Sequence, residues 1–397
     1  MLAMVFFLYL GDAVISDWLP VYLQGALSGS LLMGLMISFS SLAGMGADLI
    51  FPQLLKSISS RKMIVMAIFC VFLTAGILIL TTHWVWPVLL LLAMGTWGVY
   101  YEFLGFGLLH FVARNAPLTT RSGVWSVDTV FKSVAYFLGP LIGSWLYLSR
   151  GNYYVIGIYV LFASVAYLIW KVVGFKQGDE GVMEEFETDK VNLLAEIKCW
   201  IVLFEHVWPI LVVSLTLGLV DAAFWTTGVV LSISLIESNL WGSLFIPAYE
   251  FPSIFLGFLI AKMGIYQGKK RLAILYMILT GLFTIGLGLD GGPVIMVLLA
   301  LAIGVVTSIA WPMVDAVYSD ICARMGKEER HMMGLSSSTV NLSYITGPVA
   351  AGFLASRIGE AKTMMWIGVF VALVAVTLLF VTPLKLRLPQ KEIKSWE

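Results

Sequence analysis

The sequence predicts an all-α membrane protein with twelve transmembrane helices, arranged as two six-helix bundles related by a pseudo-two-fold axis. Hydrophobic residues make up 60% of the 397 residues and charged residues only 12%, whereas a soluble protein is about 25% charged. Apolar runs of about 20 residues recur, which is the length that a helix needs to cross a bilayer, and they lack the alternation of barrel strands. Short motifs of the first half return in the second half, which predicts the two bundles.

The apolar runs form six spans, then a polar interruption, then six further spans. The interruption, from Phe175 to Lys198, carries too many charges to enter lipid. We therefore expect an N-terminal bundle over 1–175, a cytoplasmic linker over 176–204, and a C-terminal bundle with a short cytoplasmic tail over 205–397. The expected spans cover residues 1–24, 31–56, 62–82, 86–112, 122–148, 152–175, 205–232, 239–262, 271–289, 293–321, 331–356 and 361–382.

The positions of lysine and arginine predict the orientation. Twenty of the 24 basic residues fall in the loops of one side; Arg150, Arg357 and Lys362 fall on the other side, and Lys132 lies within a span. Because cytoplasmic loops are enriched in basic residues, we expect both termini in the cytoplasm and the protein in the cell (inner) membrane. The first span lacks a basic leader and a small-residue cleavage site, so we interpret it as a retained helix and not a signal peptide.

Several classes of function are excluded by what the sequence lacks. Its net charge is zero, which gives no indication of nucleic-acid binding. The three cysteines and four histidines are widely spaced, so we expect no disulfide, no metal site and no cofactor. No phosphate-binding loop and no nucleophile–base set occur, so we expect neither an ATP-driven pump nor an enzyme with catalytic residues.

An internal repeat relates the two halves. The matching segments share both residue types and spacing, and three matches at nearly one offset are hard to obtain by chance. The matches are Asp12-Ala13 with Asp221-Ala222 and Val88–Gly95 with Val297–Gly304, both 209 residues apart, and Ala135–Ser144 with Ser343–Gly352, 208 residues apart at the Gly-Pro pair.

The whole chain resembles the major facilitator superfamily. Gly139-Pro140-x-x-Gly143-Ser144 is similar to the fifth-helix motif of that family, g-x-x-x-G-P-x-x-G-G, which is associated with antiporters. The loop from Pro52 to Arg61 departs from the family's G-x-x-x-D-x-x-G-R-R/K pattern, while Gly257–Gly264 in the second half is closer to it. The fourth-span arginine of proton-driven members is absent. The resemblance implies a monomeric secondary transporter that works by alternating access in a lipid bilayer. For Gly139, Pro140 and Gly143, and for Gly347 and Pro348, we expect roles in helix packing or gating.

In this superfamily spans one, four, seven and ten line the central cavity, and each of these spans carries an acid here. Acids within spans are rare and mark a hydrated path or a partner, so we expect these residues to bind protons or another coupling cation. Each acid alone could instead be polar glue between helices, and Asp17 could lie solvated at the outer interface. The five candidates are Asp12, Asp17, Glu102, Asp221 and Asp315.

Aromatic and polar residues near these acids are candidates for binding a small-molecule substrate. Indole and phenol rings attract cations and also stack on sugars or pack on lipophilic compounds. Glu250 lies between two prolines, where a helix kink is as plausible as ligand binding, and Asn341 fits cavity lining or helix glue equally well. The candidates are Trp225, Trp311, Tyr101, Trp97, Tyr318, Glu250 and Asn341.

One basic residue lies within a span. Asp128 and Lys132 are four residues apart on a predicted helix, so a local ion pair is the simplest account of both. The alternative is that Lys132 is the counter-ion of Asp12 or Glu102 and releases its partner when a proton arrives.

Two mechanisms and one non-transporting role follow from these residues. Competition between a proton and a cationic or lipophilic substrate for the same acids predicts proton-coupled antiport, which the Gly-Pro motif favours. Proton-coupled symport of a nutrient such as a sugar is the alternative, suggested by acids in spans one and four together. A sensor or scaffold that kept the fold is a third reading, although such a protein gains nothing from intramembrane acids.

Overall fold

The computed structural model describes residues 2–54, 60–115, 121–173, 193–256, 259, 268–289, 291–325 and 329–383. Nearly all of these residues are helical, and no strand occurs among them, which confirms the all-α prediction. Eight of the described helices are long and apolar enough to cross a membrane. The expected loop motifs at 52–61 and 257–264, most of the linker, and the C-terminal tail lie wholly or partly outside the described residues.

The first half of the chain forms one bundle with its own apolar core. Buried side chains from α1, α3, α4, α5 and α6 pack together there, and Trp18, Tyr100 and Tyr159 are its largest fully buried members. The helices are α1 (Leu2–Leu27), α2 (Ser30–Leu54), α3 (Ser60–His83), α4 (Pro87–Asn115), α5 (Arg121–Arg150) and α6 (Asn152–Val173).

The second half forms the other bundle around a separate core, in which Phe224 stacks on both Phe245 and Tyr249. Its first span is longer than predicted, because α7 continues through η1 and α8 as one rod, whereas the next span is broken into short segments. The helices are α7 (Leu193–Ala223), η1 (Phe224–Gly228), α8 (Val229–Ser238), η2 (Leu240–Leu244), α9 (Phe245–Glu250), α11 (Lys269–Gly286), α12 (Gly292–Met325), α13 (Glu329–Ile358) and α14 (Glu360–Val381).

The segment η1 is a π-helical turn in the middle of a transmembrane rod. Such a turn leaves backbone carbonyls without their usual partners. Two threonines of the turn bond backbone carbonyls of the preceding turn: the Thr226 hydroxyl donates to the carbonyl oxygen of Ala222 at 2.7 Å, and the Thr227 hydroxyl donates to that of Ala223 at 3.1 Å. The turn begins three residues after Asp221, so the irregular backbone lies beside a candidate site residue.

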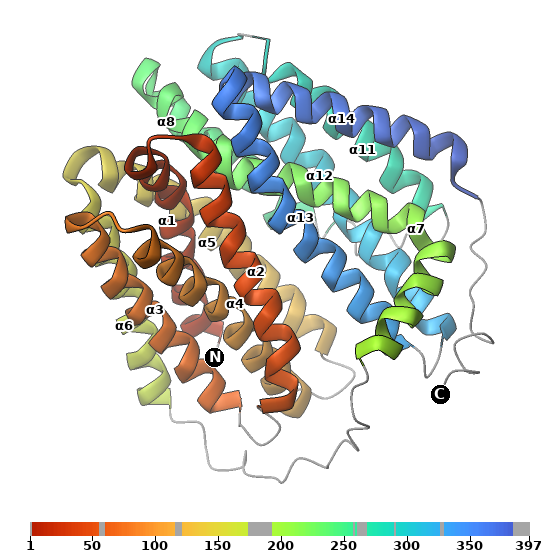
Figure 1. Cartoon of the computed structure of the whole chain (residues 1–397), viewed down its shortest axis with the longest axis horizontal. Coiled ribbons are helices and arrows are strands. Elements are labelled where there is room, and N and C mark those ends of the chain that lie inside the picture. The colour runs from red at the N-terminus through yellow and green to blue at the C-terminus, as the bar shows by residue number, and fades with distance from the viewer. Residues whose placement is uncertain are drawn as a thin grey trace.

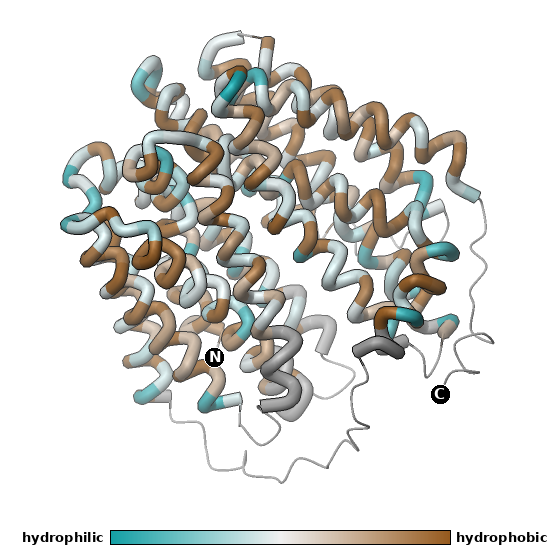
Figure 2. Tube along the Cα trace, viewed as in Figure 1, coloured by the Kyte–Doolittle hydropathy of each residue, from teal (hydrophilic) through white to brown (hydrophobic). Residues whose placement is uncertain are grey.

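Figure 1 shows the two halves of the described chain side by side. In Figure 2 hydrophobic residues predominate along the helices, and hydrophilic residues gather mainly toward the helix ends. Large apolar side chains such as Phe69, Leu168 and Phe380 are exposed on the outer surface. A lipid-facing belt explains this exposure, since a soluble protein would bury such residues.

The two halves meet most closely where α2 crosses α13. A Cβ atom on Gly34 would lie 2.1 Å from the carbonyl oxygen of Pro348, and one on Gly352 would lie 2.3 Å from that of Ser30. Near this crossing, the Gln24 amide donates to the Glu360 carboxylate at 2.9 Å. The halves are therefore in backbone contact toward the end of the molecule that holds the α1–α2 turn, opposite the N-terminus.

Candidate functional site

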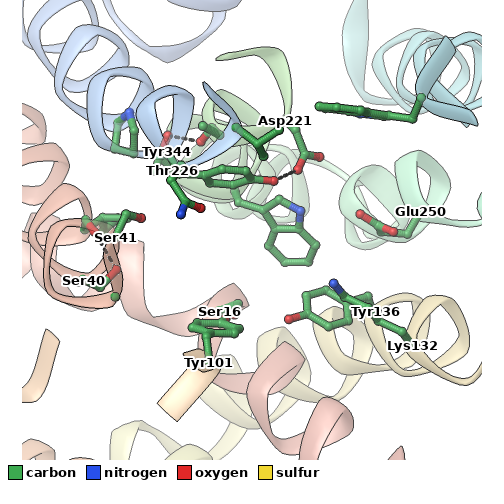
Figure 3. A pocket seen from close by; sticks show the side chains of 18 of the residues that line it. Ser16, Ser40, Ser41, Tyr101, Lys132, Tyr136, Asp221, Thr226, Glu250 and Tyr344 are labelled. Carbon is green, nitrogen blue, oxygen red and sulfur yellow. Dashed lines mark hydrogen bonds between the residues drawn. The ribbon is translucent and has the colours of Figure 1, made fainter. Parts of the chain in front are cut away.

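A cavity of about 700 Å³ lies between the two halves. The cavity begins next to the α2–α13 crossing, on the side that faces the start of α1. Its α2 residues run from Ile37 to Gly44 and therefore lie farther along α2 than Gly34, which is at the crossing. Figure 3 shows polar side chains of both halves facing each other across it. The candidate residues that line it are Trp97, Tyr101, Glu102, Lys132, Asp221, Trp225, Glu250, Trp311, Asp315, Asn341 and Pro348.

Asp221 is the acid of α7 that faces this cavity. Its Oδ1 atom accepts a hydrogen bond from the Tyr249 hydroxyl at 2.6 Å, and its Oδ2 atom accepts one from the Tyr344 hydroxyl. The side chain is only partly buried, and the indole of Trp225 lies one turn farther along the same rod. A carboxylate that accepts only two hydrogen bonds keeps acceptor capacity for a ligand or a proton.

Asp12 in the first half is held differently. Its side chain is fully buried, at 0% exposure, and it is not part of the cavity wall. The Trp97 indole donates to Oδ1 at 2.8 Å, while Tyr101 donates to Oδ2 at 2.7 Å and Tyr136 donates to the same atom. All three donors line the cavity. Asp12 therefore lies directly behind the wall, and the prediction that it faces the cavity is wrong because three aromatic side chains cover it.

The internal repeat builds the same unit in both halves. In the first half a Cβ on Gly139 would lie 2.3 Å from the Cβ of Ala13, and in the second half a Cβ on Gly347 would lie 2.7 Å from that of Ala222. These glycines let α5 approach α1 and α13 approach α7 at the Asp-Ala pairs. One turn before each glycine is a tyrosine, Tyr136 or Tyr344, which bonds the neighbouring aspartate.

The two tyrosines were missed as functional candidates in the sequence, although both fall inside the repeated segments. A search of the repeat for residues shared by both copies would have found them, since the pattern Tyr-x-x-Gly-Pro occurs in each. Tyr249, Ser40 and Ser41 also line the cavity and carried no such signal.

Lys132 and Glu250 face each other across the cavity. The Lys132 ammonium lies over the ring of Tyr136, 5.7 Å from its centre. Asp128 instead accepts a hydrogen bond from the Tyr9 hydroxyl of α1 at 3.1 Å. The predicted local Asp128–Lys132 ion pair is therefore not formed: Asp128 turns toward α1 and Lys132 extends into the cavity.

Two further predictions are corrected by the structure. Asp17 is only 2% exposed and accepts a hydrogen bond from the Ser144 hydroxyl at 2.7 Å, so it lies in the α1–α5 seam and not at a solvated interface. Tyr318 is not part of the cavity wall. Its hydroxyl lies 2.6 Å from that of Ser214 on α7, because the last turns of α12 pack against α7.

The remaining candidates line the cavity wall from three helices. Asp315 is exposed on α12 at the cavity wall, and Trp311 lies one turn from it. Glu102 and Asn341 line the wall from α4 and α13, and both have further interactions within the protein. Among the described residues no group of His, Cys, Asp or Glu side chains could hold a metal ion.

Comparisons with known proteins agree with this architecture. Residues 210–396 match the family model described as Major Facilitator Superfamily. A POT family transporter in complex with 5-aminolevulinic acid superposes with a TM-score of 0.73 at 13% identity, covering 96% of this chain and 95% of that one. A peptide transporter POT in complex with sulfate superposes with a TM-score of 0.71 at 12% identity, covering 96% and 93%. No curated protein matches the sequence. At this level of identity the solved structures establish the fold, and the expected resemblance is confirmed.

Proposed function

We propose that this chain, which matches the Major Facilitator Superfamily model over residues 210–396 and shares its fold with a POT family transporter, is a secondary transporter that carries a small amine-bearing solute together with protons. Alternating access of the two halves would expose the cavity first to one side of the membrane and then to the other. The transported solute is called the cargo below.

The charge of the cavity is the observation that supports this cargo. Acidic side chains from four helices line the wall, and Lys132 faces them. Buried or half-buried carboxylates favour a partner that is cationic, and the faces of Trp225 and Trp311 attract cations. An amine placed near Asp221 and Glu250 would satisfy both conditions, and a carboxylate on the same cargo would meet Lys132.

The separation of Asp12 from Asp221 supports symport. Asp221 faces the cavity, whereas Asp12 lies behind the aromatic wall, so a proton on Asp12 and an amine at Asp221 do not compete for one group. Both can be bound in the same transport step, which is the condition for movement in one direction. The solved structure of a POT family transporter with 5-aminolevulinic acid, an amine-bearing ligand, fits this cargo class.

Antiport of a cationic or lipophilic compound is the second candidate, and one observation favours it. Asp221 is reached directly from the cavity and lies next to the indole of Trp225. A proton and a cation could therefore displace each other at this carboxylate. The Gly-Pro motif gives no separate support for antiport, because its glycine is explained by the contact with Ala13.

Transport into proteoliposomes tests the proposal. The probes are radiolabelled 5-aminolevulinic acid, an alanyl-alanine dipeptide and the cationic dye ethidium. With the outside acidic, we expect accumulation of at least one of the first two, abolished by a protonophore. Accumulation of the dye with the inside acidic would establish antiport instead. Absence of flux for all three probes would contradict the proposal and favour the scaffold reading.

A matched pair of variants connects the flux to the cavity. We expect Asp221→Asn to reduce uptake, whereas Asp320→Asn, an exposed acid of α12 that is not in the cavity wall, should leave it unchanged. Equal uptake by both variants would remove Asp221 from the site.

We further propose a monomer in the cell membrane with both termini cytoplasmic, and hence a cavity on the cytoplasmic side.

A further inference from the structure

The hydrogen bond between Tyr136 and Asp12 joins a buried acid to the cargo cavity. Asp12 is fully buried, and the Tyr136 ring is part of the cavity wall. The same ring meets Trp225 of the other half edge-on, with ring centres 5.2 Å apart. Tyr136 thus contacts Asp12 behind the wall and Trp225 of the opposite bundle, and its ring also borders the cavity.

The arrangement around Asp12 permits one simple response to a proton. As a carboxylate, Asp12 accepts three hydrogen bonds, one at Oδ1 and two at Oδ2. A protonated carboxyl has its own hydrogen to donate and needs an acceptor. The Trp97 indole nitrogen cannot accept, since it is a donor only. A phenol oxygen can accept, so the bond to a tyrosine can reverse without movement of heavy atoms.

We propose that Tyr136 is the residue that transmits the protonation of Asp12 to the cargo. When Asp12 takes up a proton, its new O–H donates to the phenol oxygen of Tyr136. The Tyr136 hydrogen no longer has the carboxylate as acceptor and turns into the cavity, where it can donate to a carboxylate or carbonyl of the cargo. The proton stays on Asp12 and no bond other than hydrogen bonds is changed.

Tyr136 is preferred over Tyr101, which also bonds Asp12, because the Tyr136 ring contacts Trp225 of the other half. Within the described part of the chain, the Tyr101 ring contacts Trp97 and Tyr100 of its own helix. Its position beside the Lys132 ammonium also places the released O–H next to the cation that would hold a cargo carboxylate. Tyr136 is therefore a positioning residue that acts through Asp12. The cargo in this inference rests on the proposed function, whereas the reversal of the Tyr136–Asp12 hydrogen bond does not.

Other titratable groups face Asp12 and must be considered in any pH experiment. Tyr9 lies one turn before it on α1, Tyr100 and Tyr101 face it from α4, and Tyr159 faces it from α6. The Lys132 ammonium acts on it from α5. Asp12→Asn removes only the carboxyl from this set, so it identifies the part of any pH response that belongs to Asp12.

Infrared difference spectroscopy tests the reversal without any cargo. In the purified wild type, acidification should produce a carbonyl band of a protonated buried carboxyl, identified as Asp12 by its absence in Asp12→Asn. In Tyr136→Phe this band should move to higher frequency, because the phenol acceptor is missing. In Tyr344→Phe, the repeat-related control, it should not move. An unshifted band in a folded Tyr136→Phe protein, or no Asp12 band at all, overturns the proposal.

A transport arm gives a second readout, with 5-aminolevulinic acid as probe. Tyr136→Phe should lose roughly tenfold in proton-driven accumulation, as expected when a hydrogen bond to a charged group is removed, while exchange without a gradient continues. Tyr318→Phe is the control for this arm, because the Tyr318 hydroxyl bonds Ser214 outside the cavity wall, and it should keep its accumulation. Accumulation by Tyr136→Phe equal to wild type overturns the coupling role. If the wild type does not transport the probe, the proposed function fails, and the infrared arm still decides the reversal. If Tyr136→Phe does not fold, the Asp12 carbonyl band is measured in Tyr101→Phe instead. A shift of the band in that variant would assign the role to Tyr101 and overturn our proposal.

Discussion

The two repeat-related aspartates lie in the same structural unit but in different surroundings. In both halves a glycine brings two helices together at an Asp-Ala pair, and a tyrosine one turn away bonds the acid. In the first half α4 adds Trp97 and Tyr101, which close over Asp12. Asp221 has Tyr249 of α9 in place of these two residues and stays partly exposed at the cavity wall. The difference supports our proposal that access to the acid, and not its immediate partner, separates a proton site from a cargo site.

The largest expected effects come from neutralising the two aspartates separately. Asp221→Asn should raise the KM for an amine-bearing cargo by roughly ten- to hundredfold, since a hydrogen bond to a charged group contributes about 1.5–3 kcal/mol. Asp12→Asn should leave exchange active but abolish accumulation driven by a proton gradient. Exchange and gradient-driven uptake in proteoliposomes measure the two effects. The same defect in both variants would end the division of roles.

The paired glycines allow a test of the repeat in stability. Gly139→Ala should destabilise the protein by about 1–3 kcal/mol, because overpacking forces helices apart, and Gly347→Ala should have a smaller effect, since its Cβ would have more room. Gly157→Ala on α6 is the control, because its Cβ would meet no atom within 4 Å. Thermal unfolding in detergent measures all three. A Gly139→Ala protein as stable as the control would show that α5 shifts without penalty.

Lys132 allows a smaller test of cargo chemistry. Because its side chain is exposed to the cavity, Lys132→Gln should cost a carboxylate-bearing cargo about 1 kcal/mol, or roughly fivefold in KM. A cargo that has an amine but no carboxylate should bind equally well or better. Competition assays with matched pairs of compounds measure this. A uniform loss for both compounds would indicate that Lys132 supports the protein and not the cargo.

The smallest expected effect concerns the surface of the second half. Lys269 and Asp320 form an ion pair of 2.7 Å, in which the aspartate is 58% exposed. Such a pair contributes about 0.2–1 kcal/mol, so Asp320→Asn should lower the melting temperature only slightly, and less so in high salt. A loss comparable to that of Gly139→Ala would contradict the view that intramembrane packing dominates stability.

The sequence predicted the helical class, because its apolar runs have the length that a helix needs to cross a bilayer. The repeat was predictable because the same residue types recur in both halves at nearly one spacing. The sequence also predicted acids at the cavity on spans one, four, seven and ten: Glu102, Asp221 and Asp315 line the cavity, whereas Asp12 of span one does not. The domain boundaries and the cytoplasmic placement of the termini stay predictions.

The sequence could not predict how the acids are covered. The enclosure of Asp12 depends on the rotamers of aromatic residues about 85 to 125 positions away, and spacing along one helix carries no information on these. The same limit applies to Asp128, whose nearest donor is Tyr9 of another helix and not the lysine one turn away. Helical spacing gives the face of a residue, whereas its partner is decided by the packing of neighbouring helices.

The π-helical turn at Phe224–Gly228 has one more consequence. A π-bulge amounts to one surplus residue in a helix. Each residue of a regular helix turns the chain by about 100°, but a wider turn takes up one extra residue locally, so Leu231 and Leu235 keep the register that a regular rod one residue shorter would give them. The second half therefore accommodates an additional residue close to Asp221 without turning the rest of the rod away from its neighbours, and deletion of one residue in this turn should change the site more than the packing beyond it.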